Sequence, residues 1–582
     1  MNVKNQKVTN RCVFRHLVIV LSLFSIFVLP NFAQPNFAQL YAEANTKIAP
    51  DVEVLIPMRD GLMLPTNVYF PKSADAKYQA KALKATQKPP CVLIRQPLGK
   101  EYVDPAWLKL LGDGYVVAIQ STRSSCDTTG KSLPYVTDGW GELSDGYDSI
   151  EWLASSSWTN GKVATIGHSA TGITQLLLAP SNPPHLACQH IEIAAPSLYH
   201  YAVWPGGQYR KEQVDGWLQA HKRAENVSEF LRTKVDYDNF WSQFNAIDTV
   251  GNVAVPQVHI GGWYDIFSQG TLDAFCAARE FSQGDSKAEH KLIMGPWAHS
   301  YKHTQTFGDF DALAAGKAAP NPISYKDGLS YHLKGEKNSL SDTPAVQYYV
   351  MGPFDGTPSI GNKWRTAHKW PPNATYVQLY LTKDHALERE NIQTEETVCQ
   401  VLFDPLKPVP TIGGRNLFIA NGPKNLQDIE GRKDVVSFTT ETLTEDTEVT
   451  GRIAACLFAS KVLKERDICL RLSDVYPNGK SILIAEGVSH VKPDEIKGID
   501  TDPQPILVDL WSTSMVFAKG HKIRLTVSGS NFPAYDTSLL MNPEVLEEAN
   551  VEIKNLCFCL HSGGKHASYV ALPILANLDV AS

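Results

Sequence analysis

One serine of this 582-residue chain stands in a pattern that activates a hydroxyl group for nucleophilic attack. Ser169 belongs to the segment Gly-His-Ser-Ala-Thr-Gly, which follows the apolar run 163–166 and precedes the helix-forming run 173–178. A sharp turn from a strand into a helix needs small residues where the backbones crowd, and it presents the hydroxyl at the positive end of the helix. Glycine and serine also build ordinary turns, so the flanking strand and helix carry the argument. The pattern predicts a nucleophile elbow at Ser169.

A serine hydroxyl is a weak nucleophile unless a base removes its proton and a carboxylate orients that base. Asp265 ends the segment Gly-Gly-Trp-Tyr-Asp, which completes the apolar run 255–260. His299 ends the segment Gly-Pro-Trp-Ala-His, which follows the apolar run 291–294. Each residue has a second reading, Asp265 as a helix cap and His299 as an ordinary loop histidine. The order serine, aspartate, histidine is that of the α/β-hydrolase class, so we interpret the three residues as a catalytic triad.

This triad predicts transfer of an acyl group to water. Ser169 would attack an ester or amide carbonyl, His299 would move the proton, and water would then release the acid. The reaction requires neither a metal nor an organic cofactor, and the sequence contains no Cys-x-x-Cys pair of the kind that binds zinc. We therefore expect a small-molecule ester or amide substrate and no cofactor.

The elements that must position these residues have the pattern of an α/β fold. From 52 to 193, short apolar runs alternate with amphipathic segments such as 145–154, which is typical of a largely parallel sheet with crossover helices. Aromatic residues at helical spacing dominate the segment 196–252, after which the strand pattern resumes. We expect an α/β-hydrolase domain in two parts, residues 45–195 and 253–344, with a helical cap at 196–252 inserted between them.

The last part of the chain, residues 345–582, has a different texture. Short β-branched runs are separated by glycine, proline, asparagine and aspartate, as at 376–381, 468–472 and 523–527. This spacing is typical of a sandwich of antiparallel strands, so we expect an all-β jelly-roll domain. A chain of this length exceeds what one hydrophobic core accommodates, which agrees with several domains.

Charge and hydropathy limit the partners of the protein. The formal net charge of −7 argues against a nucleic-acid partner. Residues 1–44 have the order of a secretory signal peptide, with basic residues, an apolar run at 17–29 and small residues before the end at Ala44. The apolar run is shorter than the roughly 20 residues of a membrane-spanning helix. We expect a secreted or periplasmic protein without a membrane span after cleavage; a retained N-terminal anchor is the alternative.

Motifs along nearly the whole mature chain together indicate a known family. They are Ile56-Pro-Met-Arg-Asp-Gly-Leu-Met-Leu64, the segment 123–130, Asp145-Gly-Tyr-Asp-Ser-Ile-Glu-Trp152, the elbow, Gly262-Trp-Tyr-Asp265, Gly295-Pro-Trp-Ala-His299, Gly520-His-Lys-Ile-Arg-Leu525 and Ser530-Asn-Phe-Pro533. The set resembles the cocaine-esterase-like (CocE/NonD) hydrolases, which are related to X-prolyl dipeptidyl-peptidases and α-amino-acid ester hydrolases. The resemblance implies that Ser169 is the nucleophile, His299 the general base and Asp265 its orienting acid.

Two departures from the family pattern concern the oxyanion hole. The family commonly has a tyrosine after Gln-Pro or Asn-Pro, with its hydroxyl donating to the oxyanion, whereas this chain has Leu98 at that position. The residue after the nucleophile is Ala170 instead of the frequent tyrosine, but its backbone N–H still serves as a donor. Three alternatives follow. Tyr102 of the same loop supplies the missing donor, or a backbone N–H near Gly99 supplies it, or the hole lacks this donor and the enzyme hydrolyses only activated esters, slowly. Our hypothesis is the last of these, a slow enzyme that acts on activated esters.

The substrate class follows from what surrounds the predicted site. Tyr199, Tyr201 and Trp204 are the expected wall of an acyl or leaving-group pocket, although such aromatic clusters are as often plain core. Residues 194–211 contain no carboxylate, so the acidic clamp that a substrate ammonium group needs is not visible there. We therefore favour carboxylic esters or small acyl amides. The alternatives are an X-prolyl dipeptidyl-peptidase and a catalytically weakened, hydrolase-derived binding protein; the oligomeric state stays open.

Overall fold

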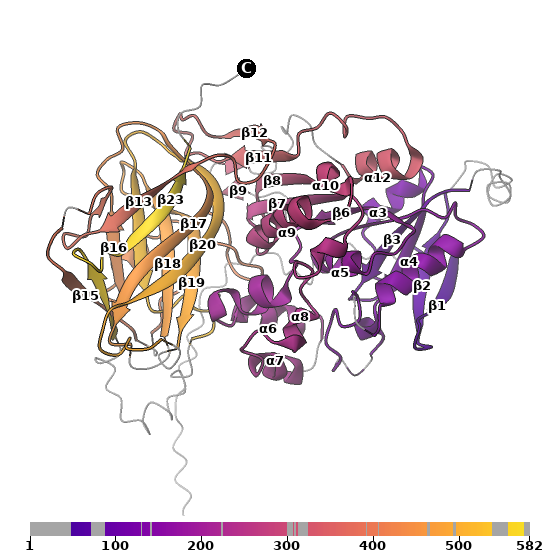
Figure 1. Cartoon of the computed structure of the whole chain (residues 1–582), viewed down its shortest axis with the longest axis horizontal. Helices are drawn as coiled ribbons and strands as arrows, with labels where there is room; N and C mark the ends of the chain where they lie inside the picture. Colours follow the sequence, from indigo (N-terminus) through magenta and orange to yellow (C-terminus); the bar gives the residue numbers. More distant parts are fainter. Residues whose placement is uncertain are drawn as a thin grey trace, which may run out of the picture.

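An α/β domain and a β-sandwich lie side by side, with a group of short helices at their junction (Figure 1). The structure is a computed structural model of the chain. It describes residues 48–71, 88–127, 129, 131–139, 142–222, 225–299, 306–307, 310–311, 324–391, 393–404, 407–462, 466–492, 496–537 and 557–575. The expected signal peptide, residues 1–44, lies outside the described residues. Within the described ranges, no helix is long and apolar enough to cross a membrane.

A ten-stranded sheet forms the centre of the α/β domain, in the order β1-β2-β4-β3-β5-β6-β7-β8-β11-β12. Neighbouring strands from β4 to β11 are parallel, and β1, β2 and β12 pair antiparallel at the two edges. Parallel strands end at the same edge of a sheet, which brings the loops after β5, β7 and β8 together. The strands are β1 (Val52–Pro57), β2 (Met63–Tyr69), β3 (Cys91–Gln96), β4 (Val116–Ser121), β5 (Val163–His168), β6 (Leu186–Glu192), β7 (Gln257–Tyr264), β8 (Lys291–Ala298), β11 (Val346–Val350) and β12 (Lys363–Ala367).

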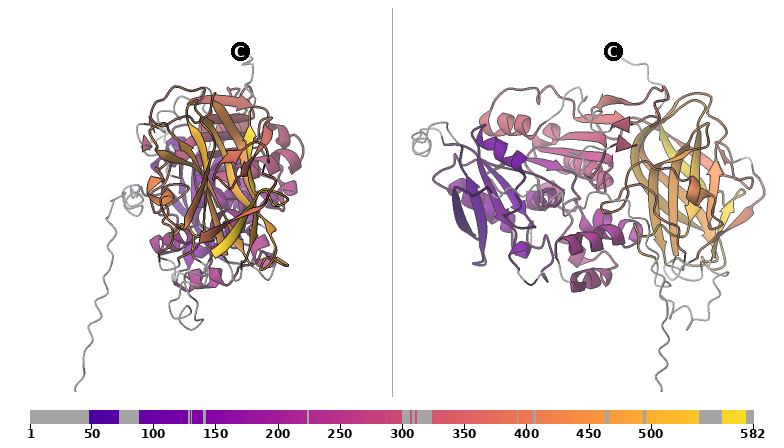
Figure 2. Two further views of the ribbon diagram at one scale, coloured as in Figure 1. Left: turned by 90° about the vertical axis from the view of Figure 1, so that its left-hand side faces the viewer. Right: turned by 180° about the vertical axis from the view of Figure 1, so that it is seen from behind.

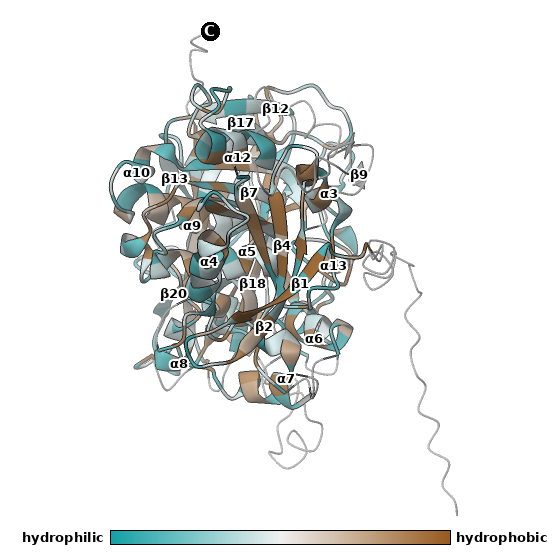
Figure 3. Ribbon diagram, turned by 90° about the vertical axis from the view of Figure 1, so that its right-hand side faces the viewer, coloured by the Kyte–Doolittle hydropathy of each residue, from teal (hydrophilic) through white to brown (hydrophobic). Residues whose placement is uncertain are grey.

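Helices cover both faces of this sheet, so most residues of its central strands are hydrophobic (Figure 3). In β3, Cys91 and Leu93 face the side of α4, while Val92 and Ile94 face the side of α3 and α12. This alternation arises because successive side chains of a strand point to opposite faces. The helices are α3 (Pro105–Leu108), α4 (Asp145–Ser155), α5 (Ala170–Leu178), α9 (Ser268–Phe281), α10 (Ser286–Glu289) and α12 (Tyr325–Lys334).

The helical insertion expected between the two parts of the α/β domain is present. It begins with a π-helical turn at Tyr199–Val203 and continues with α6 (Lys211–Ala220), α7 (Glu225–Arg232) and α8 (Asn239–Ser242). Its aromatic residues form a core of edge-to-face contacts; Trp241 is 1% exposed and packs against Tyr199 and Phe244. The aromatic residues whose spacing predicted helices therefore form the core of this cap.

The C-terminal domain is a sandwich of two antiparallel sheets (Figures 1 and 2). One sheet has seven strands, in the order β14-β13-β23-β17-β22-β15 with β20 paired to β17, and the other has four, in the order β16-β21-β18-β19. The expected α/β class with a helical cap and a C-terminal β domain is confirmed. The strands are β13 (Thr375–Leu381), β14 (Leu387–Glu388), β15 (Thr397–Leu402), β16 (Val435–Thr439), β17 (Thr447–Ser460), β18 (Arg466–Val475), β19 (Ser481–Val491), β20 (Gln504–Phe517), β21 (Lys522–Ser528), β22 (Cys557–Ser562) and β23 (Tyr569–Ile574), and the short helix is α13 (Gln427–Glu430). Earlier in the chain, β9 (Thr306–Phe307) and β10 (Phe310–Asp311) pair with each other outside both large sheets.

The sandwich and the α/β domain share one hydrophobic core. Buried residues of β7, β8 and β11 belong to the same cluster as those of β17 and β20. The backbone N–H of Met351 donates to Ser514 O at 2.9 Å, and the N–H of Val516 donates back to Met351 O at 2.9 Å. The Tyr264 hydroxyl donates to Leu483 O at 2.9 Å. These contacts hold the sandwich against the end of the sheet that carries the predicted site.

Candidate active site

Ser169 lies at the sharp turn between β5 and α5. Its backbone has φ 54° and ψ −121°, a conformation that is rare for a residue with a side chain and typical of nucleophile elbows. Two glycines make the turn possible, because a Cβ on Gly167 would lie 2.3 Å from Thr171 Oγ1 and a Cβ on Gly172 would lie 2.7 Å from Ala194 Cβ. The strained turn presents a half-buried hydroxyl at the helix N-terminus.

The three residues predicted as a triad are brought together at one edge of the sheet. Ser169 follows β5, Asp265 follows β7, and His299 follows β8. His299 Nε2 lies 2.8 Å from Ser169 Oγ, and His299 Nδ1 lies 2.6 Å from Asp265 Oδ2. Both distances are those of hydrogen bonds, so a continuous path for proton transfer joins the serine to the histidine.

The carboxylate of Asp265 is fixed by its surroundings. It is fully buried, and its second oxygen, Oδ1, accepts the backbone N–H of Phe267 at 2.9 Å. The Phe267 ring packs edge-on against the His299 imidazole, with ring centroids 5.6 Å apart. A carboxylate is only an acceptor, so His299 must carry a proton on Nδ1 and offers the Nε2 lone pair to the serine hydroxyl. This tautomer is the one that a general base requires.

The residues expected at the oxyanion hole occupy different environments. Ala170 is the first residue of α5, where backbone N–H groups have no partner within the helix. The Leu98 N–H donates to Gln96 Oε1 at 3.2 Å, and the Gly99 N–H donates to Gln96 O at 3.1 Å. The backbone donors at 98 and 99 are therefore engaged inside their own turn. Tyr102 is half-buried and is absent from the described residues that line the cavity at Ser169.

An apolar cavity of about 90 Å³ opens at Ser169. No charged side chain is among its described lining residues, and the polar ones are Ser169, Tyr135 and Gln213. The cap supplies most of the wall, and the sandwich contributes Leu417. The aromatic and aliphatic wall consists of Leu133, Ile173, Leu198, Val203, Val214, Trp217, Leu218, Leu231, Phe240, Trp241, Phe244, Ile266 and Phe267.

The three aromatic residues expected to wall a substrate pocket lie beside this cavity, within the core of the cap. The Tyr199 hydroxyl donates to Val235 O at 2.7 Å, and the Tyr201 hydroxyl donates to Asp273 Oδ2 at 2.7 Å. Trp204 packs against the Tyr209 ring. None of the three is among the described lining residues, so the aromatic wall comes from later cap residues such as Trp217. Helical spacing placed all of these residues in the cap, but it did not distinguish inner from outer faces.

Two polar residues of the cavity, Tyr135 and Gln213, were not predicted from the sequence. Gln213 on α6 is 5% exposed, and its amide oxygen has no hydrogen-bond partner among the described residues. An unpaired polar atom of this kind is destabilising by about 1–3 kcal/mol. The preceding residue, Glu212, points to the sandwich and accepts the backbone N–H groups of Leu417, Phe418 and Ile419. Glu212 thereby holds Leu417 in the cavity wall.

Comparison with known proteins identifies relatives for both parts of the chain. The family model for X-Pro dipeptidyl-peptidase (S15 family) matches residues 60–229 and 211–301. The model for the X-Pro dipeptidyl-peptidase C-terminal non-catalytic domain matches residues 338–571. Cocaine esterase of Rhodococcus sp. (strain MB1 Bresler) is 29% identical over 596 residues, which cover 90% of this chain and 98% of the relative.

Two solved structures have the same fold at low sequence identity. An aminopeptidase from a marine sediment archaeon, Thaumarchaeota archaeon, aligns with a TM-score of 0.71 and 21% identity over 94% of this chain and 99% of its own. An α-amino-acid ester hydrolase aligns with a TM-score of 0.69 and 21% identity over 95% of this chain and 100% of its own.

The sheet order and these matches define a serine hydrolase of the α/β-hydrolase class with a C-terminal β domain. More specifically, the chain is similar over nearly its whole length to the cocaine-esterase-like (CocE/NonD) hydrolases and to the S15 peptidases. The family resemblance read from its motifs is confirmed.

Proposed function

We propose that this protein hydrolyses carboxylic esters or small acyl amides with an apolar acyl group through a Ser169–His299–Asp265 mechanism. One observation carries the proposal: Ser169 Oγ lies 2.8 Å from His299 Nε2 and opens into a cavity without charged lining residues in the described part of the chain. The name of the Rhodococcus relative, cocaine esterase, agrees with an ester substrate.

The reaction proceeds in two halves. Ser169 Oγ forms a bond to the substrate carbonyl carbon as its proton passes to His299 Nε2, and that proton then leaves with the alcohol or amine. A water molecule attacks the acyl-enzyme, gives its proton to His299, and the acid departs as Ser169 regains its proton. Asp265 stays ionised throughout and stabilises the imidazolium that forms in each half.

The oxyanion that forms in each half needs hydrogen-bond donors. The backbone N–H of Ala170 supplies one from the N-terminus of α5. The family's second donor is a tyrosine hydroxyl at the position that Leu98 occupies here. Leu98 has no hydroxyl, and its N–H donates to Gln96 Oε1. We propose that the hole works with one donor fewer, which slows esters that have poor leaving groups.

The cavity lining supports an apolar acyl group. An ammonium group buried there would meet no carboxylate among the described lining residues, and desolvating an unpaired charge is strongly unfavourable. This argues against the second candidate function, that of an X-Pro dipeptidyl-peptidase. That candidate is retained because the S15 family model matches the chain. Gln213 narrows the acyl group further. Its amide oxygen has no partner among the described residues, so an acyl group with a donor such as a hydroxyl or amide N–H would satisfy it.

We also propose that the protein is exported. The support is the sequence of residues 1–44, with its basic start, its apolar run and its small residues before Ala44. N-terminal sequencing of protein recovered from the medium or periplasm should begin near Glu43 to Asn45. Recovery of soluble protein that starts at Met1 from the cytoplasm would overturn this part of the proposal.

A fluorophosphonate probe tests the catalytic proposal, because it labels a serine only when a neighbouring base activates it. The wild-type protein should be labelled at Ser169, and Ser169→Ala should not be labelled. A panel of chromogenic esters with apolar acyl groups, compared with aminoacyl and X-Pro anilides, then tests the substrate class. Absence of labelling would favour the hydrolase-derived binding protein, and preference for X-Pro anilides would favour the peptidase.

A further inference from the structure

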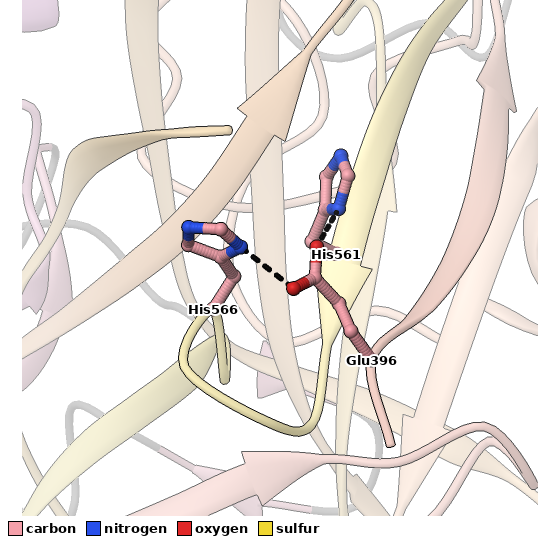
Figure 4. A group of neighbouring side chains, drawn as sticks. All are labelled: Glu396, His561 and His566. Carbon is pink, nitrogen blue, oxygen red and sulfur yellow. Dashed lines mark hydrogen bonds and ion pairs between the residues drawn. The ribbon is translucent and has the colours of Figure 1, made fainter. Parts of the chain in front are cut away.

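Three side chains of the β-sandwich converge far from Ser169, on a different part of the fold. His561 Nδ1 lies 2.9 Å from Glu396 Oε1, and His566 Nδ1 lies 2.8 Å from Glu396 Oε2. Figure 4 shows both imidazole rings turned toward the one carboxylate. The three ligand atoms lie within 4.8 Å of one another. Two imidazole nitrogens thus flank one carboxylate, each at a different oxygen.

The three residues come from separate segments of the large sheet. Glu396 immediately precedes β15, the edge strand, which pairs with β22 from Thr397 to Leu402. His561 lies on β22, and His566 lies in the turn between β22 and β23. The separations along the chain are 165 residues from Glu396 to His561 and 170 from Glu396 to His566. A bond among the three would tie the edge strand to the turn beside it.

The surrounding residues hold His561 in position. Its Nε2 lies 2.8 Å from Ser460 Oγ on β17, and its carbonyl accepts the Ser568 hydroxyl at 2.6 Å. Ser568 Oγ in turn accepts the Phe458 N–H at 2.8 Å. Metal-bound histidines are commonly fixed by such a bond at the second ring nitrogen. The ring of His561 is therefore oriented before any ligand arrives.

We propose that Glu396, His561 and His566 form a binding site for a divalent transition-metal ion, with Zn²⁺ the best match to two imidazoles and one carboxylate. Imidazole nitrogen suits zinc, whereas calcium and magnesium prefer sites made only of oxygen ligands. The site lies in the sandwich, away from the triad, and an ion bound there would join the segment before the edge strand to the β22–β23 turn.

Metal binding requires the three side chains to move. Around Zn²⁺ with bonds of about 2.0–2.2 Å in tetrahedral geometry, neighbouring ligand atoms lie about 3.4 Å apart. The two histidines now bond to different oxygens of Glu396, and the three ligand atoms lie within 4.8 Å of one another, so the rings must turn toward one shared point. Each imidazole loses its Nδ1 proton to its own Nε2 or to solvent, and the freed lone pair binds the metal. The Nε2–H of His561 then donates to Ser460 Oγ. Side-chain exposures of 31% for Glu396 and 16% for His566 leave room for a water as the fourth ligand.

Zinc binding by the full-length mature protein, free of any histidine tag and treated with a chelator, tests this proposal. Isothermal titration with Zn²⁺ should give one site per chain, and thermal unfolding should shift upward by a few degrees. Co²⁺ should produce the visible absorption bands of a four-coordinate site. Glu396→Gln and His566→Gln should each weaken zinc affinity at least about tenfold and abolish those bands.

The chain offers a matched control in a second histidine–glutamate pair at the surface. His185 Nδ1 lies 2.6 Å from Glu151 Oε2, and neither residue belongs to a metal-like cluster of the described residues. His185→Gln should leave zinc affinity unchanged. The proposal is overturned if the wild-type protein binds no stoichiometric zinc, or if the two site variants bind it as well as the control. Because His561 is buried, the test does not depend on substituting it.

Discussion

The side chain of Gln96 accepts the backbone N–H of Leu98 at 3.2 Å, two residues further along the same turn. The carbonyl of Gln96 accepts the N–H of Gly99 in the same way. The turn after β3 therefore directs its backbone donors inward. A leucine at position 98 supplies no hydroxyl, so we expect this segment to contribute no donor to the oxyanion.

Restoring a hydroxyl at position 98 should accelerate hydrolysis. One oxyanion donor is typically worth about 10²–10³ in rate, because it meets charge that develops only in the transition state. We expect Leu98→Tyr to raise kcat at least about tenfold on esters with poor leaving groups. Leu98→Phe is the matched control, since it adds the ring without the hydroxyl. Equal kcat values for the two folded variants would contradict the proposal that the oxyanion hole lacks a donor.

Removal of the Tyr102 hydroxyl should have little effect. Tyr102 lies on the same turn as Leu98, but it is not among the described residues that line the cavity at Ser169. Tyr102→Phe should keep kcat within about threefold of wild type, whereas loss of a working donor would cost about 10² or more. Tyr135, which does line the cavity, provides the comparison. A large fall in kcat for Tyr102→Phe or Tyr135→Phe would identify the donor and contradict the proposed deficit.

Asp265→Asn should lower kcat by several orders of magnitude without unfolding the protein. The Phe267 N–H donates to Oδ1, so an asparagine would keep its oxygen at that N–H and turn its NH₂ toward His299. The imidazole would then carry its proton on Nε2 and could not accept from Ser169. We expect a loss of about 10⁴ in kcat with an unchanged unfolding temperature. Turnover near the wild-type rate would remove Asp265 from the mechanism.

Gln213 should select acyl groups that carry a hydrogen-bond donor. Gln213→Met keeps the volume and removes an amide oxygen that has no partner among the described residues, so the variant should be at least as stable as wild type. Its kcat/KM on a plain aliphatic ester should stay or rise, while kcat/KM on an ester with a hydroxylated acyl chain should fall about tenfold or more. A parallel change on both esters would show that Gln213 does not read the acyl group.

Acid should destabilise the fold through two buried histidines. Burial lowers the pKa of His259 and of His290 to about 3 each, from the ordinary value of 6.5. Between these values the unfolded chain binds protons that the folded chain does not, so stability falls as pH falls below 6.5. The expected loss is about 2 kcal/mol per histidine by pH 5.

Thermal unfolding at pH 7 and pH 5 measures this loss. The unfolding free energy should differ less between the two pH values in His259→Gln than in wild type. The reduction should be about half of the loss expected from His259 and His290 together. His185→Gln, at an exposed ring, should leave the difference unchanged. If His259→Gln preserves the wild-type pH dependence, the buried imidazole is not its source.

Sequence alone determined the features that depend on local pattern. Apolar runs followed by small-residue turns located Ser169, Asp265 and His299 in the order of the class, and the spacing of β-branched runs indicated the sandwich. The expected strand at 163–166 corresponds to β5, and that at 291–294 to β8. These signals are local because strand and helix periodicity, and the steric needs of a sharp turn, act over a few residues.

Tertiary structure decided what depends on neighbours distant in the chain. Strand β6 was not predicted because Gln189, His190 and Glu192 interrupt its apolar run. Helices distant in the chain cover these side chains: Gln189 donates to Gln175 O of α5, and the His190 ring packs against Tyr325 of α12. The cavity wall was not predicted either: Trp217 of α6 lines the cavity at Ser169, whereas Tyr199 of the π-helical turn lies outside the described lining and donates to Val235 O. Leu417 reaches the site from the sandwich through Glu212, 205 residues earlier. No local pattern encodes such contacts, since they arise only when separate domains share a core.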